Sequence, residues 1–313
     1  MMNEKAQLQN NQCRGLLLKN ESLASYTSWH LGGNAKQIYQ PADIDDLSFF
    51  LKQLSHNEKI FWLGAGTNLL VREKGFDGTV ILLKDAINNI KLLSEDEIQK
   101  LNFQSVAKNK KIIYAEAGIL GAKLAMFAVE HGLSGLEFLA GIPGTVGGAL
   151  VMNAGAYGNS TWPHVVSVIT VNRQGEQKYR SSNEFDFSYR TVIGKENEKF
   201  LAAYFVLESG NRTEMLQAVH AMLAQRKASQ PLEFPNAGCV FRNPKNDFAA
   251  RLIETAGLKG FRIGGACVST KHANFIVNDN HATPTDVMNI IDHVIKTVRE
   301  KHHVELEREV IIL

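Results

Sequence analysis

The spacing of apolar and polar residues predicts a chain in which helices and short strands alternate. The short apolar runs that predict strands lie at residues 60–63, 79–83, 112–118, 165–172 and 200–207. Apolar residues at helical spacing lie at residues 41–54, 121–131, 213–227 and 247–256. Alternation of this kind is typical of an α/β or α+β protein.

The two ends of the chain differ in pattern. Residues 1–20 begin with a polar stretch that has no apolar run of the kind found in a signal peptide, and we expect a disordered tail there. Near the other end, Thr283 is a suitable cap for a helix that begins at Pro284 and runs to about His302. A final strand is predicted over residues 304–313.

Length, charge and cysteine content narrow the class of protein. A chain of 313 residues is long for a single core and suggests two or three domains. Its formal net charge of +2 gives no reason to expect a nucleic-acid partner, and no apolar stretch reaches the roughly 18 residues of a membrane helix. The three cysteines form no CxxC pair, so we expect reduced thiols in a cytoplasmic protein and no metal site.

Glycine gathers in two places. The predicted strand 60–63 runs directly into Gly64-Ala65-Gly66-Thr67-Asn68, and the stretch 132–158 reads GLSGLEFLAGIPGTVGGALVMNAGAYG. Backbone N–H groups in such turns can hold a pyrophosphate, and two glycine-rich elements can hold both ends of a dinucleotide. A plain tight turn and a close crossing of two backbones are the alternatives. Neither motif is a GxGxxG fingerprint that opens a helix or a P-loop, which disfavours a nicotinamide domain and an ATPase.

The two motifs, GAGTNLLV and GIPGTVGGALVMNAGAYG, resemble those of the UDP-N-acetylenolpyruvylglucosamine reductases. Later segments agree in the same order: FSYR at 187–190, AGCVFRNP at 237–244, LKG at 258–260 and LEREV at 306–310. The resemblance begins at about residue 20, and the length suggests the shorter form of the family, which lacks an inserted substrate-capping loop.

The resemblance implies an α+β fold with a flavin domain of the PCMH and vanillyl-alcohol oxidase type. This FAD-binding domain, made of two subdomains, would span residues 21–208. A C-terminal substrate-binding domain would span residues 209–313, with the final strand returning toward the flavin.

Non-covalent FAD is the cofactor that the resemblance implies. The residues that would bind it are Gly64, Ala65, Gly66, Thr67, Asn68, Leu69, Gly118, Pro143, Gly144, Thr145, Gly147, Asn153, Gly155 and Ala156.

The reaction implied by the resemblance is a two-step hydride relay. NADPH reduces the FAD and NADP⁺ leaves. The enolpyruvyl substrate then enters the same cleft, takes a hydride on its terminal carbon and a proton on the adjacent carbon, and becomes UDP-N-acetylmuramate. We expect a monomer that binds a UDP-sugar and has no nucleic-acid or membrane partner.

Three residues match the family's catalytic positions. Arg190 would hold the substrate carboxylate with its planar guanidinium, although a surface salt bridge is the ordinary role of such an arginine. Cys239 stands where the family most often has serine, and would be the proton donor. A free cysteine can instead be a small buried apolar residue. Glu309 matches the catalytic glutamate, although Glu305 and Glu307 have the same parity on the predicted strand.

The nucleotide part of the substrate is expected to contact other residues of the second half. Arg242 and Asn243 match positions that contact the nucleotide sugar. Lys227 is a weaker candidate for its diphosphate, together with Arg226.

Two other functions remain open. A flavin oxidase of the same fold group would use oxygen and another substrate, and often carries a covalent flavin. A non-enzymatic sugar-nucleotide sensor would bind the substrate without consuming NADPH.

Overall fold

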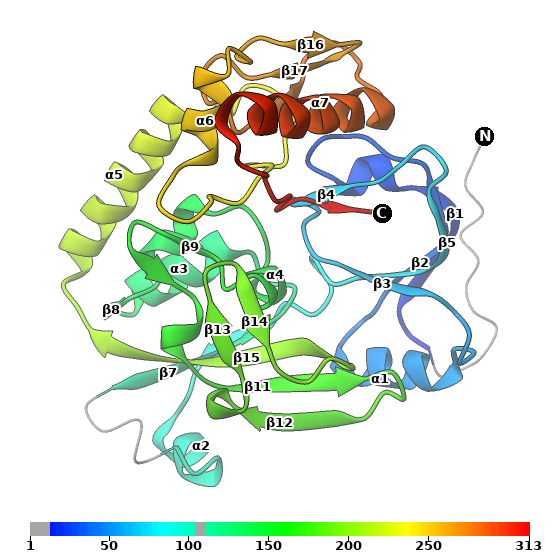
Figure 1. Ribbon diagram of the computed structural model, residues 1–313. Helices are drawn as coiled ribbons and strands as arrows, with labels where there is room; N and C mark the ends of the chain where they lie inside the picture. The colour runs from blue at the N-terminus through cyan, green and yellow to red at the C-terminus, as the bar shows by residue number, and fades with distance from the viewer. Residues whose placement is uncertain (1–12, 104–109) are drawn as a thin grey trace. The chain divides into compact units, whose positions relative to one another are not determined.

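The computed structural model describes residues 13–103 and 110–313. Two compact units divide the chain, and neither is a continuous stretch. Unit 1 comprises residues 1–18, 38–65 and 80–224, and unit 2 comprises residues 19–37, 66–79 and 225–313. The chain therefore passes between the units several times, which differs from the division at residue 208 suggested by the family resemblance. The mixture of helices and strands confirms the α+β class (Figure 1).

Unit 1 is built on a six-stranded antiparallel sheet of order β12-β11-β15-β7-β6, with β8 paired to β15. Its strands are β6 (Ile90–Leu92), β7 (Lys111–Glu116), β8 (Leu133–Ser134), β11 (Val165–Asn172), β12 (Gln177–Ser181) and β15 (Glu198–Ser209). Side chains that alternate along β7 show why the sheet is covered on both faces. Ile113 and Ala115 belong to one apolar cluster, whereas Ile112 and Tyr114 belong to another.

Helices of unit 1 supply the rest of those two clusters. Helices α3 (Gly121–Glu130) and α4 (Val146–Val151) pack on the first face, and α1 (Ile44–Gln53) packs on the second. The other helices and strands of unit 1 are α2 (Glu95–Lys100), β3 (Ile60–Leu63), the pair β9 (Gly155–Ala156) and β10 (Asn159–Ser160), and the hairpin β13 (Asp186–Ser188) and β14 (Thr191–Ile193). Helix α5 (Arg212–Ser229) has residues in both units. Among the described residues, short 3-10 helices lie at Glu137–Gly141, Trp162–His164 and Ser182–Glu184 in unit 1 and at Leu23–Tyr26 in unit 2.

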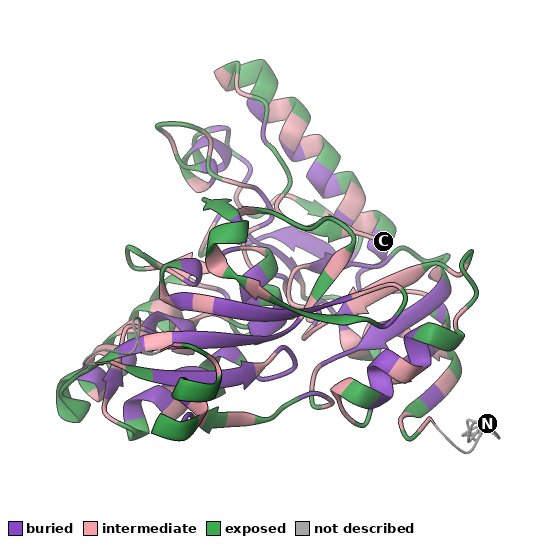
Figure 2. Ribbon diagram, turned by 90° about the horizontal axis from the view of Figure 1, so that it is seen from below, coloured by how far each residue is buried: buried purple, intermediate pink, exposed green. Residues whose placement is uncertain are grey.

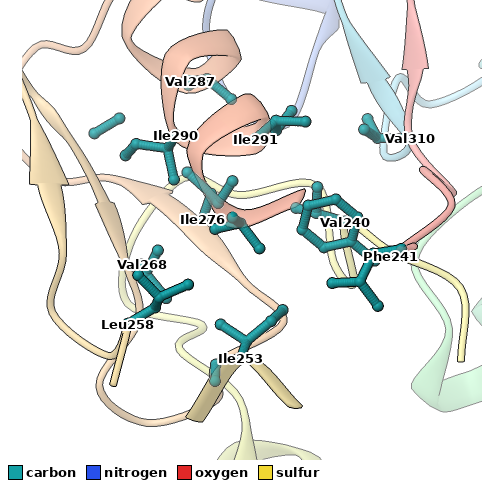
Figure 3. Close-up of a cluster of buried hydrophobic side chains, with 14 of the residues drawn as sticks. Val240, Phe241, Ile253, Leu258, Val268, Ile276, Val287, Ile290, Ile291 and Val310 are labelled. Atoms are coloured by element: carbon teal, nitrogen blue, oxygen red, sulfur yellow. The ribbon is translucent and has the colours of Figure 1, made fainter. Parts of the chain in front are cut away.

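Unit 2 packs one long helix against a small sheet. Helix α7 (Pro284–His302) begins with a capping box, in which Thr283 and Asp286 bond to each other's backbone amides. The sheet is β16 (Arg262–Ile263), β17 (Ala266–Val268) and β18 (Ile276–Asn278), and α6 (Ala249–Thr255) lies beside it. Figure 3 shows Val287, Ile290 and Ile291 of α7 among the other side chains of this core.

A further four-stranded sheet has the order β1-β2-β5-β3. Strands β1 (Leu16–Ser22), β2 (Asn34–Gln40) and β5 (Phe76–Leu82) each have residues in both units. Buried residues run along β5, β7, β11 and β15, whereas β12 and β13 are mostly exposed, and buried and exposed residues alternate along the long helices (Figure 2).

Two sequence predictions about the chain ends are wrong in extent. The predicted tail, 1–20, overlaps β1, because Leu17 is buried and the strand pairs with β2. Residues 1–12 of that tail lie outside the described residues. The predicted strand 304–313 is reduced to β19 (Ile311–Ile312), since only these residues find a continuous partner, β4 (Leu69–Leu70).

The glycine-rich stretch also contains more regular structure than its composition suggests. Helix α4 forms within it, capped by Thr145, whose hydroxyl accepts the Gly148 N–H at 3.4 Å.

Candidate flavin and substrate site

The two glycine motifs meet inside unit 1. A Cβ added to Gly64, at the end of β3, would lie 2.6 Å from Oγ1 of Thr145. Thr145 belongs to the second motif, and its backbone bridges to Leu120. Two segments 80 residues apart in the sequence are thus in direct contact.

The second motif is tied to the end of strand β7. The Val146 and Gly147 amides donate to the carbonyls of Ile119 and Ala117, at 2.7 and 2.9 Å. A Cβ on Gly147 would lie 3.0 Å from that of Ala117. At Gly118, a Cβ would lie 2.0 Å from the carbonyl oxygen of Leu83. These glycines therefore allow close crossing of protein backbones, one of the two uses expected from the sequence.

The later part of the first motif belongs to unit 2 and packs on the loop after β1. Gly66 has a φ of +63°, and a Cβ there would lie 1.9 Å from the carbonyl oxygen of Tyr26. Its carbonyl accepts the Ser28 N–H at 3.1 Å. Asn68 donates its side-chain amide to the Glu309 carbonyl at 3.1 Å, and Leu69 is buried in β4. A side chain at Gly66 would therefore disrupt the protein before it met a ligand.

The surface of the second motif has the features that a dinucleotide requires. Pro143 and Gly148 are exposed, and Gly144, between Pro143 and Thr145, has a φ of +141°, which residues with side chains rarely adopt. Backbone is thus accessible beside the Gly64 contact, and backbone amides in such turns are suitable partners for phosphate oxygens. The residues present fit a bound FAD.

Asn153 and Gly155, two of the predicted cofactor ligands, contact the β13–β14 hairpin instead. The Asn153 carboxamide donates to the Ser188 carbonyl at 3.1 Å and accepts the Trp162 N–H at 3.1 Å. The Gly155 carbonyl accepts from Nη1 of Arg190 at 3.3 Å. The Asn153 side chain is therefore engaged by protein groups, and Ala156 continues the same segment as part of β9.

Arg190 lies at the tip of that hairpin. Ser188 pairs with Thr191, so Tyr189 and Arg190 form a two-residue loop, and Arg190 has a φ of +54°. Its guanidinium lies over the Tyr189 ring, 5.1 Å from the ring centroid. Strained backbone of this kind is concentrated at functional sites in proteins.

Cys239 and Glu309 lie on two neighbouring segments of unit 2. The Glu309 amide donates to the carbonyl of Val240, the residue after Cys239, at 2.8 Å. Phe241 forms an antiparallel bridge with Arg308, and the Arg242 amide donates to the Glu307 carbonyl at 2.9 Å. The side chains of Cys239 and Glu309 are half-buried, whereas Glu305 and Glu307 are exposed. This difference favours Glu309 among the three glutamates.

The predicted substrate ligands are also in unit 2. Arg242 is half-buried, next to Asn243, whose carboxamide oxygen accepts the Ala249 N–H at the start of α6 at 3.1 Å. Lys227 is exposed on α5, and its carbonyl accepts from the Lys271 ammonium at 2.7 Å. Lys271 was given no role from the sequence, since a lysine far along the chain carries no signal of its neighbours.

The predicted catalytic residues are thus divided between the units. Arg190 belongs to unit 1, and Cys239 and Glu309 belong to unit 2. The structure brings Cys239 together with Glu309, and Arg190 together with Asn153 and Gly155. Tyr189 and Trp162, which help to form the hairpin site, were not singled out in the sequence, although Tyr189 lies within the quoted segment FSYR.

None of the three cysteines, Cys13, Cys239 and Cys267, forms a disulfide bond in the described structure. Over residues 13–103 and 110–313, no three histidine, cysteine or acidic side chains are placed to hold a metal ion. No helix in the described part of the chain has the length and apolar character needed to cross a membrane.

Comparison with known proteins covers both halves of the chain. A family model described as FAD binding domain matches residues 35–178. A second model, described as UDP-N-acetylenolpyruvoylglucosamine reductase, C-terminal domain, matches residues 230–313.

Relatives and a solved structure agree with these matches. Two proteins named UDP-N-acetylenolpyruvoylglucosamine reductase, from Thiobacillus denitrificans and Coxiella burnetii (strain Dugway 5J108-111), are 47% and 48% identical to this chain. They align over 96% of it and over 93% and 96% of their own lengths. The crystal structure of UDP-N-acetylenolpyruvylglucosamine reductase from Thermus caldophilus is 30% identical, with a TM-score of 0.75 over 96% of this chain and 98% of that one. The chain belongs to the family of UDP-N-acetylenolpyruvoylglucosamine reductases.

Proposed function

We propose that the protein reduces UDP-N-acetyl-enolpyruvylglucosamine to UDP-N-acetylmuramate, a precursor of peptidoglycan, with NADPH as the reductant. The observation that carries this proposal is family membership over nearly the whole chain, which includes both the FAD-binding domain and the C-terminal domain. Non-covalently bound FAD supplies the hydride carrier between NADPH and the enolpyruvyl double bond. We further propose a cytoplasmic monomer without nucleic-acid or membrane partners.

We propose that residues of both glycine motifs bind the FAD; of these, residues 64–65 and 143–147 belong to unit 1. The backbone of residues 64–69 and 143–147 is proposed to contact the phosphates and ribityl chain of the FAD. Gly118 is proposed to support this site by letting its own loop pack closely on neighbouring backbone. Asn153, Gly155 and Ala156 would contribute through their backbone, because the Asn153 carboxamide is engaged elsewhere.

Arg190 is proposed to bind the substrate carboxylate. Hydride addition to the terminal carbon of the enol ether places negative charge on the adjacent carbon and its carboxylate. A fixed guanidinium stabilises that charge more than the charge of the starting double bond, which lowers the barrier. Two parallel N–H groups also orient the carboxylate plane.

Cys239 is proposed to protonate the carbon that bears the carboxylate, which completes the reduction. A thiol, with a reference pKa of about 8.5, is a stronger acid than the serine hydroxyl usual in the family. Glu309 lies on the segment paired beside it and would orient the carboxylate or share the proton. Regeneration of the thiol takes one proton from solvent, so each turnover consumes one NADPH and one proton.

The nucleotide would lie along the cationic residues of unit 2. Arg242 is proposed to contact the nucleotide sugar, to which it offers a planar pair of donors, and Lys227, with Arg226, is proposed to contact the diphosphate. Asn243 would use the nitrogen end of its carboxamide, since the oxygen caps α6.

The purified protein gives the direct test. We expect an oxidised-flavin absorbance spectrum, release of the flavin on denaturation, and NADPH oxidation that depends on the enolpyruvyl substrate. Colour that stays with the denatured chain, together with oxygen-dependent turnover, would indicate the flavin oxidase. Substrate binding without NADPH oxidation would indicate a sensor. Either result would overturn the proposal.

A further inference from the structure

Arg190 depends on a buried side chain that is not itself in a position given a catalytic role. Asn153 is only 5% exposed and has a φ of +39°, a backbone conformation that asparagine tolerates better than most residues. A buried carboxamide must find hydrogen-bond partners, and both ends of this one do. Its nitrogen bonds the Ser188 carbonyl and its oxygen bonds the Trp162 amide.

The first of these bonds fixes the hairpin next to its tip. Ser188 is the last residue of β13, immediately before the loop that carries Arg190. Two residues along from Asn153, the Gly155 carbonyl accepts from the Arg190 guanidinium. The segment 153–155 thus holds the hairpin both at its backbone and at the arginine side chain.

The second bond joins this segment to a rigid part of unit 1. Trp162 is 1% exposed, and its indole N–H donates to the Leu150 carbonyl at 2.8 Å. Its ring stacks on Phe187 of β13, with 5.9 Å between centroids and 20° between planes. Asn153 therefore connects the hairpin to a fully buried residue of unit 1.

These restraints on the hairpin are needed because the backbone of its loop is strained at Arg190. A two-residue turn with positive φ at its second position favours glycine or asparagine there, and arginine in that conformation is strained. Without a restraint, the loop would relax and move the guanidinium.

We propose that Asn153 is a positioning residue: it holds the Ser188 carbonyl so that the strained loop presents the Arg190 guanidinium in the orientation that binds the substrate carboxylate. This inference rests on the proposed function, in which Arg190 contacts that carboxylate.

The test measures the two half-reactions of the FAD-loaded enzyme separately. Asn153→Ala should slow reoxidation of the reduced flavin by the enolpyruvyl substrate about 10-fold to 100-fold, the range expected when a group moves by about 1 Å. Reduction of the flavin by NADPH should slow much less than this, because Asn153 is proposed to contact the FAD only through its backbone, which alanine retains. Thr161→Val is the matched control, because it removes another hydrogen bond of this segment, from a buried hydroxyl to the Ala154 carbonyl, without touching the hairpin. It should leave both half-reactions unchanged.

A double-mutant cycle separates positioning from a general structural role. In an Arg190→Ala background, Asn153→Ala should have no further effect on the substrate step. Losses that multiply, or equal slowing of flavin reduction, would overturn the inference while leaving the proposed function standing. Failure of the wild-type enzyme to be reoxidised by the substrate would overturn both. If Asn153→Ala does not fold, Asn153→Gly, which tolerates the left-handed backbone, replaces it in the same cycle.

Discussion

The β13–β14 hairpin and the crossing of residues 239–242 with 307–310 hold proposed catalytic residues in opposite ways. In the hairpin, Arg190 sits in a strained loop, and the neighbouring Phe187 is 43% exposed. In the crossing, Phe241 is 2% exposed within the main core of unit 2 (Figure 3). Backbone hydrogen bonds join the two segments.

The difference shows two routes to a fixed side chain. The crossing is fixed by burial, so its geometry should be as stable as the folded state of unit 2 itself. The hairpin is fixed by a few polar contacts on a mostly exposed element, so its geometry can be lost while the unit remains folded. Mutation of Arg190 should therefore change the reaction rate with little change in the free energy of unfolding, whereas mutations near Cys239 should change both quantities.

The largest effect is expected at Cys239. Cys239→Ala should bind the substrate and accept hydride from NADPH, yet lose about 10²–10⁴-fold in substrate reduction, the usual contribution of a general acid. Cys239→Ser should remain active, because the usual family residue is a hydroxyl. Rapid-mixing absorbance measurements of both half-reactions check this. Turnover of Cys239→Ala at the wild-type rate would mean that the proton comes from water or Glu309.

Alkylation provides a control on the same residue. Burial raises the pKa of both other thiols, Cys13 and Cys267, which lowers their reactive thiolate fraction. Cys13, placed in a disordered tail by the sequence, packs against the core of unit 1. A thiol reagent should therefore inactivate the wild type, bound substrate should protect it, and Cys239→Ser should resist. Inactivation of Cys239→Ser at the same rate would identify another thiol as the target.

Burial of the crossing predicts a large loss of stability on truncation. Phe241→Ala should lower the free energy of unfolding by about 3–5 kcal/mol, the range for a fully buried aromatic residue. Phe187→Ala, in the hairpin, should cost only about 1 kcal/mol, mainly its contact with Trp162. Urea denaturation of the two variants compares them directly. Similar losses would remove the distinction between the two elements.

Arg190→Ala should affect chemistry without such a loss. We expect reoxidation by the substrate to slow about 10²–10³-fold, the cost of losing one preorganised charge contact. Flavin reduction by NADPH should stay near the wild-type rate, and the free energy of unfolding should change little, because alanine is about as strained as arginine at a φ of +54° and the side chain removed is only half-buried. Arg190→Lys should also be impaired, since an ammonium lacks the planar pair of donors. Equal slowing of both half-reactions would point to a defect in folding or flavin binding.

The smallest expected effect is a pH dependence shared by the two units. Burial lowers the pKa of His164 in unit 1 and of His272 in unit 2. The unfolded chain then takes up protons first as the pH falls below about 6.5, so stability is constant above that pH and decreases below it. His164→Gln and His272→Gln should each reduce this slope between pH 7 and pH 5, measured by thermal unfolding. An unchanged slope in both variants would place its origin elsewhere.

Much of the fold could be predicted because the period of the apolar residues decides it. Strand β11 has the predicted bounds 165–172, and helix α7 begins at the predicted cap, Thr283. Helix α1 begins at Ile44 instead of near Pro41, because Asp43 provides the side-chain cap. The division into units could not be predicted, since it depends on which distant segments pair.

Only those residues of the candidate site that lie in family motifs could be predicted from the sequence. Family motifs indicated Arg190, Cys239 and Glu309, but nothing in the sequence indicated that the Asn153 side chain faces the hairpin. Gly66 and Gly118, which the family resemblance implies are cofactor ligands, are also each packed on a protein carbonyl in the structure. Composition cannot distinguish these uses, because both require the absence of a Cβ.

Because β4 pairs with β19 near the end of the chain, unit 2 should complete its folding later during synthesis than most of unit 1. Strand β4 directly follows the first glycine motif, and its partner consists of residues 311–312. At roughly 5–20 residues per second, the ribosome delivers β19 on the order of tens of seconds after β4. Unit 2 therefore has to wait for the last residues, while most of unit 1 is complete by residue 224. A nascent chain stalled once residue 224 has left the ribosome exit tunnel should protect the β11–β15 sheet from proteolysis, while residues 66–70 stay open to cleavage.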